Sequence, residues 1–198
     1  FGFETAFSEA VKSISSAHTE ALGAMNGIGI VKLMGRQSGF IACFAALAMN
    51  DVNFVLIPEV PFRLEGENGF LNSLKRRLER RRHAVIVLAE GAGQEYLNTD
   101  KSMTDASGNV LLGDIGLYMK QVIGDYFQRI NMQITMKYID PSYIIRSVPA
   151  SPQDRVFCLR LAQVAAHAAM AGKTDLIVGR YYNKLVHIPM KLAASGRK

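Results

Sequence analysis

Cysteine and long apolar runs are both scarce in this sequence, and each scarcity excludes a class of protein. The 198 residues include only two cysteines, Cys43 and Cys158. Two thiols cannot build the disulfide framework of a small secreted domain. Because both lie in apolar, helix-like stretches, we expect buried thiols in a reducing, intracellular compartment. No apolar run approaches the roughly 20 residues that a helix needs to cross a bilayer, so we predict no membrane partner.

Metal-ligand patterns are missing as well. The four histidines are scattered, with no cysteine or carboxylate at the spacing of a metal site; they are His18, His83, His167 and His187. We therefore predict that this segment binds no metal through its own side chains.

Positive charge exceeds negative charge, with 23 Lys and Arg residues against 17 Asp and Glu residues and a formal net charge of +6. Such an excess suits an anionic partner, either a phosphate metabolite or a nucleic acid. The densest basic run, Lys75–Arg82, overlaps Leu71, Leu74 and Leu78 at helical spacing, which predicts a basic solvated face on an amphipathic helix. Because no interleaved aromatic residues or binding motif accompany this run, we expect no nucleic-acid partner.

The start of the sequence has neither a methionine nor a signal-peptide pattern. It opens with Phe1-Gly2-Phe3 and enters a helical pattern at once, over residues 4–24. This abrupt entry leads us to expect that the sequence begins inside a larger polypeptide.

Strand-like and helix-like segments alternate along the chain, as they do in layered α/β folds with a largely parallel sheet. The strongest strand signal is the nearly pure apolar run Ala84–Ala89, which is typical of a strand buried on both faces. Strands are predicted at 27–34, 53–57, 84–89, 134–139 and 176–179, with a hairpin through 183–188 left open. Helices are predicted at 4–24, 38–50, 69–82, 114–129 and 153–171.

Polar residues follow three of these strands, at the edge where open parallel sheets bind ligands. The first place is Met34–Gly39, between a strand and a helix. Gly35 would let a ligand approach the backbone, the first helix amides would face an anion, and Arg36 adds a planar donor for phosphate. The alternative is an ordinary turn capped by Ser38, and spacing alone does not separate the two.

The second and third places follow the strands at 84–89 and 134–139. Glu90 precedes Gly91 and Gly93, so its carboxylate could accept hydrogen bonds from ligand hydroxyls, or it could simply be solvated. Lys137, Tyr143 and Arg146 offer an ammonium, a phenol and a guanidinium that could cradle a phosphorylated sugar. Taken singly, each of these three also fits an exposed or ion-paired structural residue.

In order and spacing these segments resemble the phosphofructokinase family, from Phe1 to at least Pro189. The segments that carry the resemblance are Gly27–Arg36, Ser38-Gly39, Leu56–Glu59, Glu90-Gly91, Asp105–Asn109 and Lys137–Arg146. Within the family they are most similar to the plant and trypanosomatid type of ATP-dependent enzyme. The resemblance implies a three-layer α/β fold, with a fructose 6-phosphate-binding domain at 1–146 and a C-terminal segment at 147–198 that packs back on the donor-nucleotide domain.

The resemblance also implies roles for individual residues. Met34, Gly35 and Arg36 would contact fructose 6-phosphate, and Arg36 would stabilise charge on the phosphoryl group in flight. Glu90 would hold sugar hydroxyls. The residues that would bind the sugar phosphate are Tyr143, Ile144, Ile145 and Arg146, with Lys137 reaching the 6-phosphate, as in relatives that share sites between chains. Where bacterial members place an arginine that enters a neighbour's site, this sequence has Gly27, which argues against the bacterial form of sharing.

The same resemblance implies what this segment does not carry. The family's donor-phosphate loop and aspartate base lie upstream of Phe1, so ATP and Mg²⁺ would be bound mainly by an N-terminal half, and this segment alone would be inactive. The parent would be a glycolytic ATP-dependent 6-phosphofructokinase and a homo-oligomer, either dimer or tetramer. It would lie in the cytoplasm, with a plastid or glycosome as alternatives. A pyrophosphate-dependent enzyme and a non-catalytic regulatory paralogue stay open.

Two further arginines, Arg81 and Arg82, end the basic helix just before the strand that leads to Glu90. They lie near the position where bacterial relatives bind allosteric phosphates, which makes them a candidate effector site. The alternative is that basic residues at a helix C-terminus serve only the helix dipole and solubility.

Overall fold

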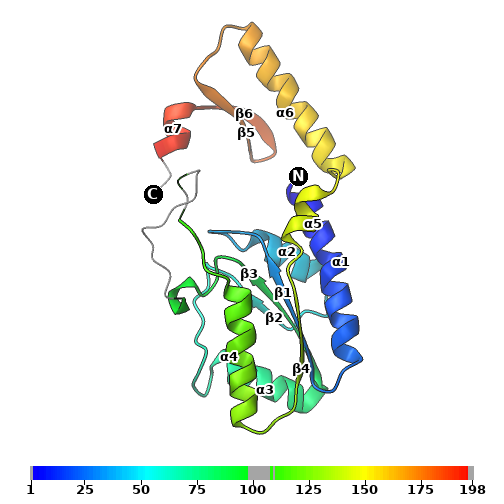
Figure 1. Cartoon of the computed structure of the whole chain (residues 1–198). Helices are drawn as coiled ribbons and strands as arrows, with labels where there is room; N and C mark the ends of the chain where they lie inside the picture. Colours follow the sequence, from blue (N-terminus) through cyan, green and yellow to red (C-terminus); the bar gives the residue numbers. More distant parts are fainter. Residues whose placement is uncertain (1, 98–107, 109, 196–198) are drawn as a thin grey trace. The chain divides into compact units, whose positions relative to one another are not determined.

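The structure, a computed structural model, describes residues 2–97, 108 and 110–195, whose contacts divide the chain into two compact units (Figure 1). Unit 1 spans Phe3–Val148, and unit 2 runs from Pro149 onward and takes in Gly2. The functions assigned from sequence to residues 1–146 and 147–198 stay predictions.

Unit 1 is built on a four-stranded parallel sheet, which confirms the predicted largely parallel arrangement. In spatial order the strands are β2 (Phe54–Leu56), β3 (His83–Ala89), β1 (Gly27–Leu33) and β4 (Thr135–Ile139). Leu33 pairs with Ala89, so β1 and β3 end level with each other. Ile139 pairs with Val31, so β4 ends two residues earlier along β1. We call this side of the sheet the carboxyl edge.

Helices cover both faces of this sheet, as the predicted three-layer fold requires (Figure 1). The elements are α1 (Phe3–Leu22), α2 (Phe40–Ala48), α3 (Phe70–Arg81), the short 3₁₀ helix η1 (Gln94–Tyr96), α4 (Ile115–Arg129) and α5 (Ser142–Ser147). Alternate strand side chains face opposite layers. Ile86 and Leu88 lie in a core with α3 and α4, whereas Val85 and Val87 lie in a second core with α1 and α2.

Helix α1 packs unusually closely on β1 because both elements carry small residues where they meet. Ala17 and Ala21 are buried on α1. A Cβ atom added at Gly27 would lie 2.1 Å from the Ala21 carbonyl oxygen, and one at Gly29 would lie 2.9 Å from Ala17. Position 27 therefore has no room for a side chain as large as arginine.

Helix α3 confirms the amphipathic pattern predicted for the basic run. Leu71, Leu74 and Leu78 are buried, while the arginines that follow at 80–82 are exposed. The helix is followed by its C-cap residue Arg82, whose backbone has φ 61° and whose N–H donates to the Leu78 carbonyl. The basic face is thus the solvated side of a core helix.

Unit 2 consists of one long helix, a hairpin and a short last helix: α6 (Pro152–Met170), β5 (Leu176–Tyr181), β6 (Lys184–Pro189) and α7 (Met190–Ser195). The two strands are antiparallel, so the hairpin considered from sequence is present. Its turn residues Tyr182 and Asn183 have φ of 43° and 65°, the left-handed pair that tight hairpins use. None of the helices in the described ranges is long and apolar enough to span a membrane.

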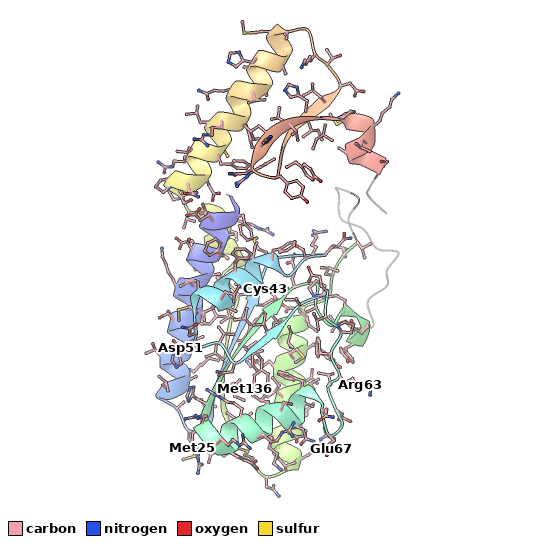
Figure 2. The ribbon with its side chains drawn as sticks, turned by 180° about the vertical axis from the view of Figure 1, so that it is seen from behind. Met25, Cys43, Asp51, Arg63, Glu67 and Met136 are labelled. Carbon is pink, nitrogen blue, oxygen red and sulfur yellow. The ribbon has the colours of Figure 1, made fainter. Side chains whose placement is uncertain are left out.

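The structure buries neither thiol fully, so the expected burial of both is wrong. Cys43 is half-buried on α2 (Figure 2), but Cys158 is exposed on α6. Val156 and Leu159 are exposed beside it. Apolar neighbours in sequence do not bury a helical residue, because a helix buries only the stripe that faces its partner.

Candidate functional site

The first two predicted places form one constellation at the carboxyl edge. The Glu90 N–H donates to the Leu33 carbonyl at 2.8 Å, and the Gly35 N–H approaches Glu90 Oε1 at 3.4 Å. A Cβ atom at Gly91 would lie 1.8 Å from the Arg36 carbonyl oxygen, and Gly35 has φ 141°. Gly91 requires glycine because the two turns touch there through their backbones. Gly35 requires it because of its positive φ and because a Cβ atom there would lie 2.3 Å from the Ser38 carbonyl oxygen.

The side chains of this constellation divide into buried and accessible ones. Met34 is buried in the core, so only its main chain could meet a ligand. Arg36 is exposed and Glu90 is half-buried. A guanidinium and a carboxylate thus stand together at the strand ends, a combination that offers donors to phosphate and an acceptor to hydroxyl groups.

The N-terminus of α2, which follows Arg36, is not capped by Ser38, the alternative that the sequence left open. Gly39 rather than Ser38 is the N-cap, with no side-chain cap bond of its own. The Gly39 N–H instead meets the Glu59 carboxylate, with nitrogen–oxygen distances of 2.8 and 3.0 Å. The alternative of a Ser38 cap does not hold, because the N-cap is Gly39 and the loop after β2 delivers a carboxylate to the helix start.

The third predicted place lies on α5, a helix that sequence reasoning missed. Ile145 is fully buried in the core that also contains Met34 and Ala89, which seats α5 beside the other two strand ends. Tyr143 is 86% exposed, and Ile144 and Arg146 are exposed too. The Ile145 side chain therefore anchors the helix, while those of Tyr143 and Arg146 are available to a ligand. Asp140-Pro141-Ser142, a turn followed by a helix start, was the available signal.

Lys137 is not brought to the same place. It lies in the middle of β4, paired in register with Gly29, and its Nζ is 3.2 Å from Glu20 Oε1. Gly29 precedes Met34 by five residues, which is about 16 Å along a strand. The contact of Lys137 with a 6-phosphate stays a prediction, and so does any contact of Lys137 across a subunit boundary. Apart from Gly108, the segment Asp105–Asn109 lies outside the described residues.

A cluster of charged groups near the carboxyl edge was also missed from sequence. Lys32 Nζ lies 2.8 Å from Asp140 Oδ2 and 3.3 Å from Asp114 Oδ2. The Tyr138 hydroxyl donates to Asp114 Oδ1 at 3.2 Å. These residues come from β1, from the loop before α4 and from β4 and its following turn. Only the tertiary fold brings them together, so no local pattern could have predicted them.

Burial and pairing act against each other on these groups. Burial disfavours the charged form of Lys32, but the hydrogen bond to Asp140 and the neighbouring groups outweigh it and raise the pKa of Lys32. Burial alone would raise the pKa of Asp114 and of Asp140, yet hydrogen bonds and the Lys32 charge lower both. Burial raises the pKa of Tyr138 to about 12, so its hydroxyl stays a donor.

The two candidate effector arginines differ in their surroundings. Arg81 lines a basic cavity of about 480 Å³ on α3, whose other lining residues are Ser73, Arg76, Arg77 and Arg80. Arg82 is not among them. Burial, followed by the charge of Arg81, lowers the pKa of Arg77. A concentration of positive charge of this kind suits an anion.

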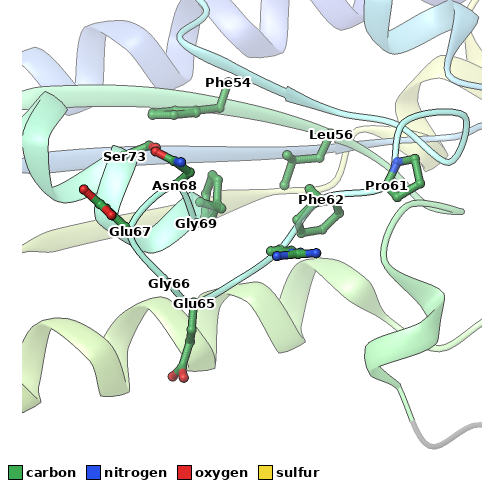
Figure 3. A pocket seen from close by; sticks show the side chains of 12 residues that line it. Phe54, Leu56, Pro61, Phe62, Glu65, Gly66, Glu67, Asn68, Gly69 and Ser73 are labelled. Atoms are coloured by element: carbon green, nitrogen blue, oxygen red, sulfur yellow. The ribbon is translucent and has the colours of Figure 1, made fainter.

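A larger cavity, of about 570 Å³, lies beside β2 and contains no predicted site residue. Phe54, Leu56 and Phe62 line it, with Glu65 and Glu67 at its polar side (Figure 3). We place the candidate site at the ends of β1 and β3, because that is where the predicted polar groups converge, and cavity size alone does not outweigh chemistry.

Within the described part of the chain, no three His, Cys, Asp or Glu side chains are grouped to hold a metal ion. Around the candidate site the accessible groups are two arginines and a tyrosine, with Glu90 as the only carboxylate predicted for it. This set suits phosphate and hydroxyl groups better than it suits a divalent cation.

The known proteins to which this chain is similar are phosphofructokinases. The family model for Phosphofructokinase matches residues 1–169. An ATP-dependent 6-phosphofructokinase of Borreliella burgdorferi is 55% identical over 203 residues, covering 100% of this chain and 45% of that protein. ATP-dependent 6-phosphofructokinase 7 of Arabidopsis thaliana is 51% identical, covering 96% of this chain and 39% of that protein.

Solved structures agree on the fold. A pyrophosphate-dependent phosphofructokinase from Marinobacter aquaeolei superposes with a TM-score of 0.67 at 18% identity, covering 96% of this chain and 46% of that one. At this identity the likeness concerns the fold alone. The chain spans less than half the length of the curated relatives named above.

Proposed function

Because the chain belongs to the phosphofructokinase family, we propose that the protein carrying it transfers the γ-phosphoryl group of ATP to the 1-hydroxyl of fructose 6-phosphate. The carboxyl edge of unit 1 would be the acceptor site. The observation that carries this proposal is the backbone contact between the Gly35-Arg36 turn and Glu90-Gly91. That contact sets an anion-binding guanidinium next to a hydroxyl-binding carboxylate.

Each accessible group has a part in this reaction. Tyr143 and Arg146 hold the 6-phosphate, and Glu90 accepts hydrogen bonds from sugar hydroxyls. Arg36 faces the phosphoryl group in flight, where a fixed positive charge lowers the barrier most. The 1-hydroxyl oxygen forms the new bond to phosphorus, the bond to the ADP oxygen breaks, and the hydroxyl proton passes to a base outside the described residues.

The donor and its metal belong to the same proposal. The curated relatives at 51–55% identity are ATP-dependent, which supports ATP over pyrophosphate. Bound Mg²⁺ would neutralise charge on the donor phosphates. The residues of this chain would instead bind and orient the sugar phosphate. We also propose a homo-oligomeric enzyme, in which Lys137 could meet a 6-phosphate in a neighbouring copy.

Two arginine variants of the intact protein test the acceptor site. Arg146→Ala removes a charged hydrogen-bond donor, and we expect the KM for fructose 6-phosphate to rise about 10- to 100-fold. Arg36→Ala removes transition-state stabilisation, and we expect kcat to fall about 100- to 1,000-fold. Arg129→Ala is the matched control, because Arg129 is the last residue of α4 and is not one of the proposed site residues. It should change neither parameter more than twofold. Unchanged kinetics in both site variants would contradict the assignment of the carboxyl edge as the acceptor site.

The basic cavity on α3 supports a second, regulatory proposal. Arg81 would bind an anionic effector there, and Arg82 would add charge from beside it. The double variant Arg81→Ala with Arg82→Ala should lose the response of the intact enzyme to phosphate-bearing effectors while keeping its basal KM. An effector response that survives the double substitution would argue against this site.

A further inference from the structure

Lys32 is a lysine held almost out of solvent between two carboxylates. Its side chain is 13% exposed, and it lies on β1 two residues before Met34. Its Nζ pairs with Asp140 on one side and Asp114 on the other, at 2.8 and 3.3 Å. Burying an ammonium group is costly unless it is paired, so the fold holds Lys32 here only together with its partners.

Each carboxylate uses its two oxygens for different tasks. Asp140 Oδ2 faces Lys32, while Oδ1 accepts the Ser142 N–H at 3.0 Å and the Ser142 hydroxyl at 2.5 Å, at the start of α5. Asp114 Oδ2 also faces Lys32, while Oδ1 accepts the N–H groups of Gly116 and Leu117 at 3.0 and 3.1 Å, at the start of α4. Both carboxylates therefore connect one cation to the first turn of a helix.

We propose that Lys32 is a positioning residue that fixes α5, with Tyr143 and Arg146, relative to the Arg36 turn. Lys32 belongs to the strand that ends in the Arg36 turn, and Asp140 belongs to the turn that starts α5. The ion pair is therefore a direct link between the two halves of the acceptor site. This inference rests on the proposed function, because it assigns Lys32 a role in binding the sugar phosphate.

The charge of Lys32 matters as much as its reach. Without it, Asp114 and Asp140 would face each other with no cation between them, and like charges in a partly buried setting repel. Besides Lys32, Asp140 is bonded to Ser142 at the start of α5, whereas Asp114 is bonded to two α4 amides and to Tyr138. We expect Asp140 to move and to take the start of α5 with it. Tyr143 and Arg146 would then be misplaced, although neither touches Lys32.

Steady-state kinetics of the intact protein test this link. Lys32→Met keeps the length of the side chain and removes its charge, and we expect the KM for fructose 6-phosphate to rise at least tenfold. The KM for ATP should stay within twofold, because the donor does not contact α5 in the proposed site. Lys75→Met, which removes an exposed i,i+4 pair with Glu79 on α3, is the matched control and should leave both KM values unchanged.

Two more variants separate positioning from general stability. Lys32→Arg restores the charge and should recover at least part of the affinity for the sugar phosphate. Asp140→Asn keeps an oxygen for Ser142 but loses the charge that pairs with Lys32, so it should also raise the sugar KM. The double variant Lys32→Met with Asp140→Asn should raise the KM for fructose 6-phosphate no more than the more severe single variant does, because both changes break the same link. Should Lys32→Met fail to fold, Asp140→Asn carries the same test.

The outcomes distinguish this inference from the function on which it rests. An unchanged sugar KM in Lys32→Met, or an equal rise in both KM values, would overturn the positioning role. If Arg36→Ala and Arg146→Ala alter the kinetics and Lys32→Met does not, only the positioning role fails. If the two arginine variants also behave as wild type, the acceptor site itself is wrong.

Discussion

The two units of this chain bury apolar side chains to very different extents. Unit 1 has a core on each face of its sheet, with large side chains such as Ile86 and Phe127 fully buried. In the described part of unit 2, only Ala168 and Asp154 are buried, and α6 exposes Val156 and Leu159. Unit 1 thus contains its own stabilising core, whereas unit 2 shows too little burial to offset the entropy of ordering its helix and hairpin. This contrast supports the prediction, made from the sequence, that residues 147–198 pack on a donor-nucleotide domain.

A pair of leucine substitutions gives the largest effect expected from this contrast. Leu74 is a fully buried residue of α3, and Leu74→Ala should lower the free energy of unfolding by about 2–5 kcal/mol. Leu159 is 59% exposed, and Leu159→Ala in this chain should change it by less than about 0.5 kcal/mol. Urea unfolding of both variants measures the difference. Equal losses would show that α6 has a core of its own.

The same leucine in the intact protein sharpens the comparison. If another part of the protein covers α6, Leu159→Ala should cost about 1–3 kcal/mol there, because the side chain would then be buried. Thermal unfolding of the intact wild type and variant measures this cost. An effect as small as in the isolated chain would argue that α6 stays uncovered.

The next effect concerns the contact between the two turns of the site. Gly91→Ala places a methyl group where the Arg36 carbonyl now lies, and backbone cannot yield as a flexible side chain can. We expect a loss of about 1–3 kcal/mol in stability and a lower affinity for fructose 6-phosphate. Gly66→Ala is a fair comparison for stability, because its added Cβ would meet nothing within 4 Å, although its φ of 102° adds strain. Wild-type affinity in Gly91→Ala would contradict the proposed contact.

The Lys32 cluster predicts a pH dependence with a definite sign. The lowered pKa values of Asp114 and Asp140 mean that these groups stabilise the fold above the ordinary value of 3.8, and this contribution is lost as pH falls through their folded pKa. The raised pKa of Lys32 means that its contribution is complete below 10.5 and is lost only as pH rises through the folded pKa.

Lys32→Met should therefore cost about 1–2 kcal/mol at neutral pH, a value between those of exposed and buried pairs because the carboxylates are a third exposed. The cost should be constant from about pH 6 to 9 and should shrink below about pH 4. Urea unfolding of wild type and variant across this range measures it. A cost that grows towards acid pH would contradict the assigned pairing.

The smallest effect belongs to a helix cap in unit 2. The Ser151 hydroxyl accepts the Asp154 N–H at 3.2 Å at the start of α6. Ser151→Ala should lower stability by about 0.5–1 kcal/mol, the lower part of the range for helix caps, if α6 unfolds with the rest of the protein. No change in the melting temperature of the whole chain would indicate that α6 unfolds separately from unit 1.

Much of unit 1 could be predicted from the sequence because its signals are local. The apolar run at 84–89 indicates a buried strand by its composition and length, and the leucine spacing on α3 indicates a helix by its period. The turn at Gly35 and the position of Glu90 could be placed because both directly follow strands. Helix α5 was missed because a six-residue helix carries almost no periodic signal.

Features that depend on tertiary contacts could not be predicted. The Lys32 cluster joins residues more than 100 positions apart, and the Glu59 carboxylate reaches Gly39 from the loop after β2. Lys137 looked equivalent to Tyr143 in sequence, yet strand register places it opposite Gly29. The exposure of Cys158 depends on what α6 packs against, which its own sequence does not reveal.

The most direct test of the account is amide hydrogen exchange of the intact protein with and without fructose 6-phosphate. We expect slower exchange on binding in peptides that cover 33–36, 90–91 and 142–147, with little change in the basic face of α3 at 75–82. Protection confined to α3, or no protection at the carboxyl edge of unit 1, would contradict the claim that this edge is the acceptor site.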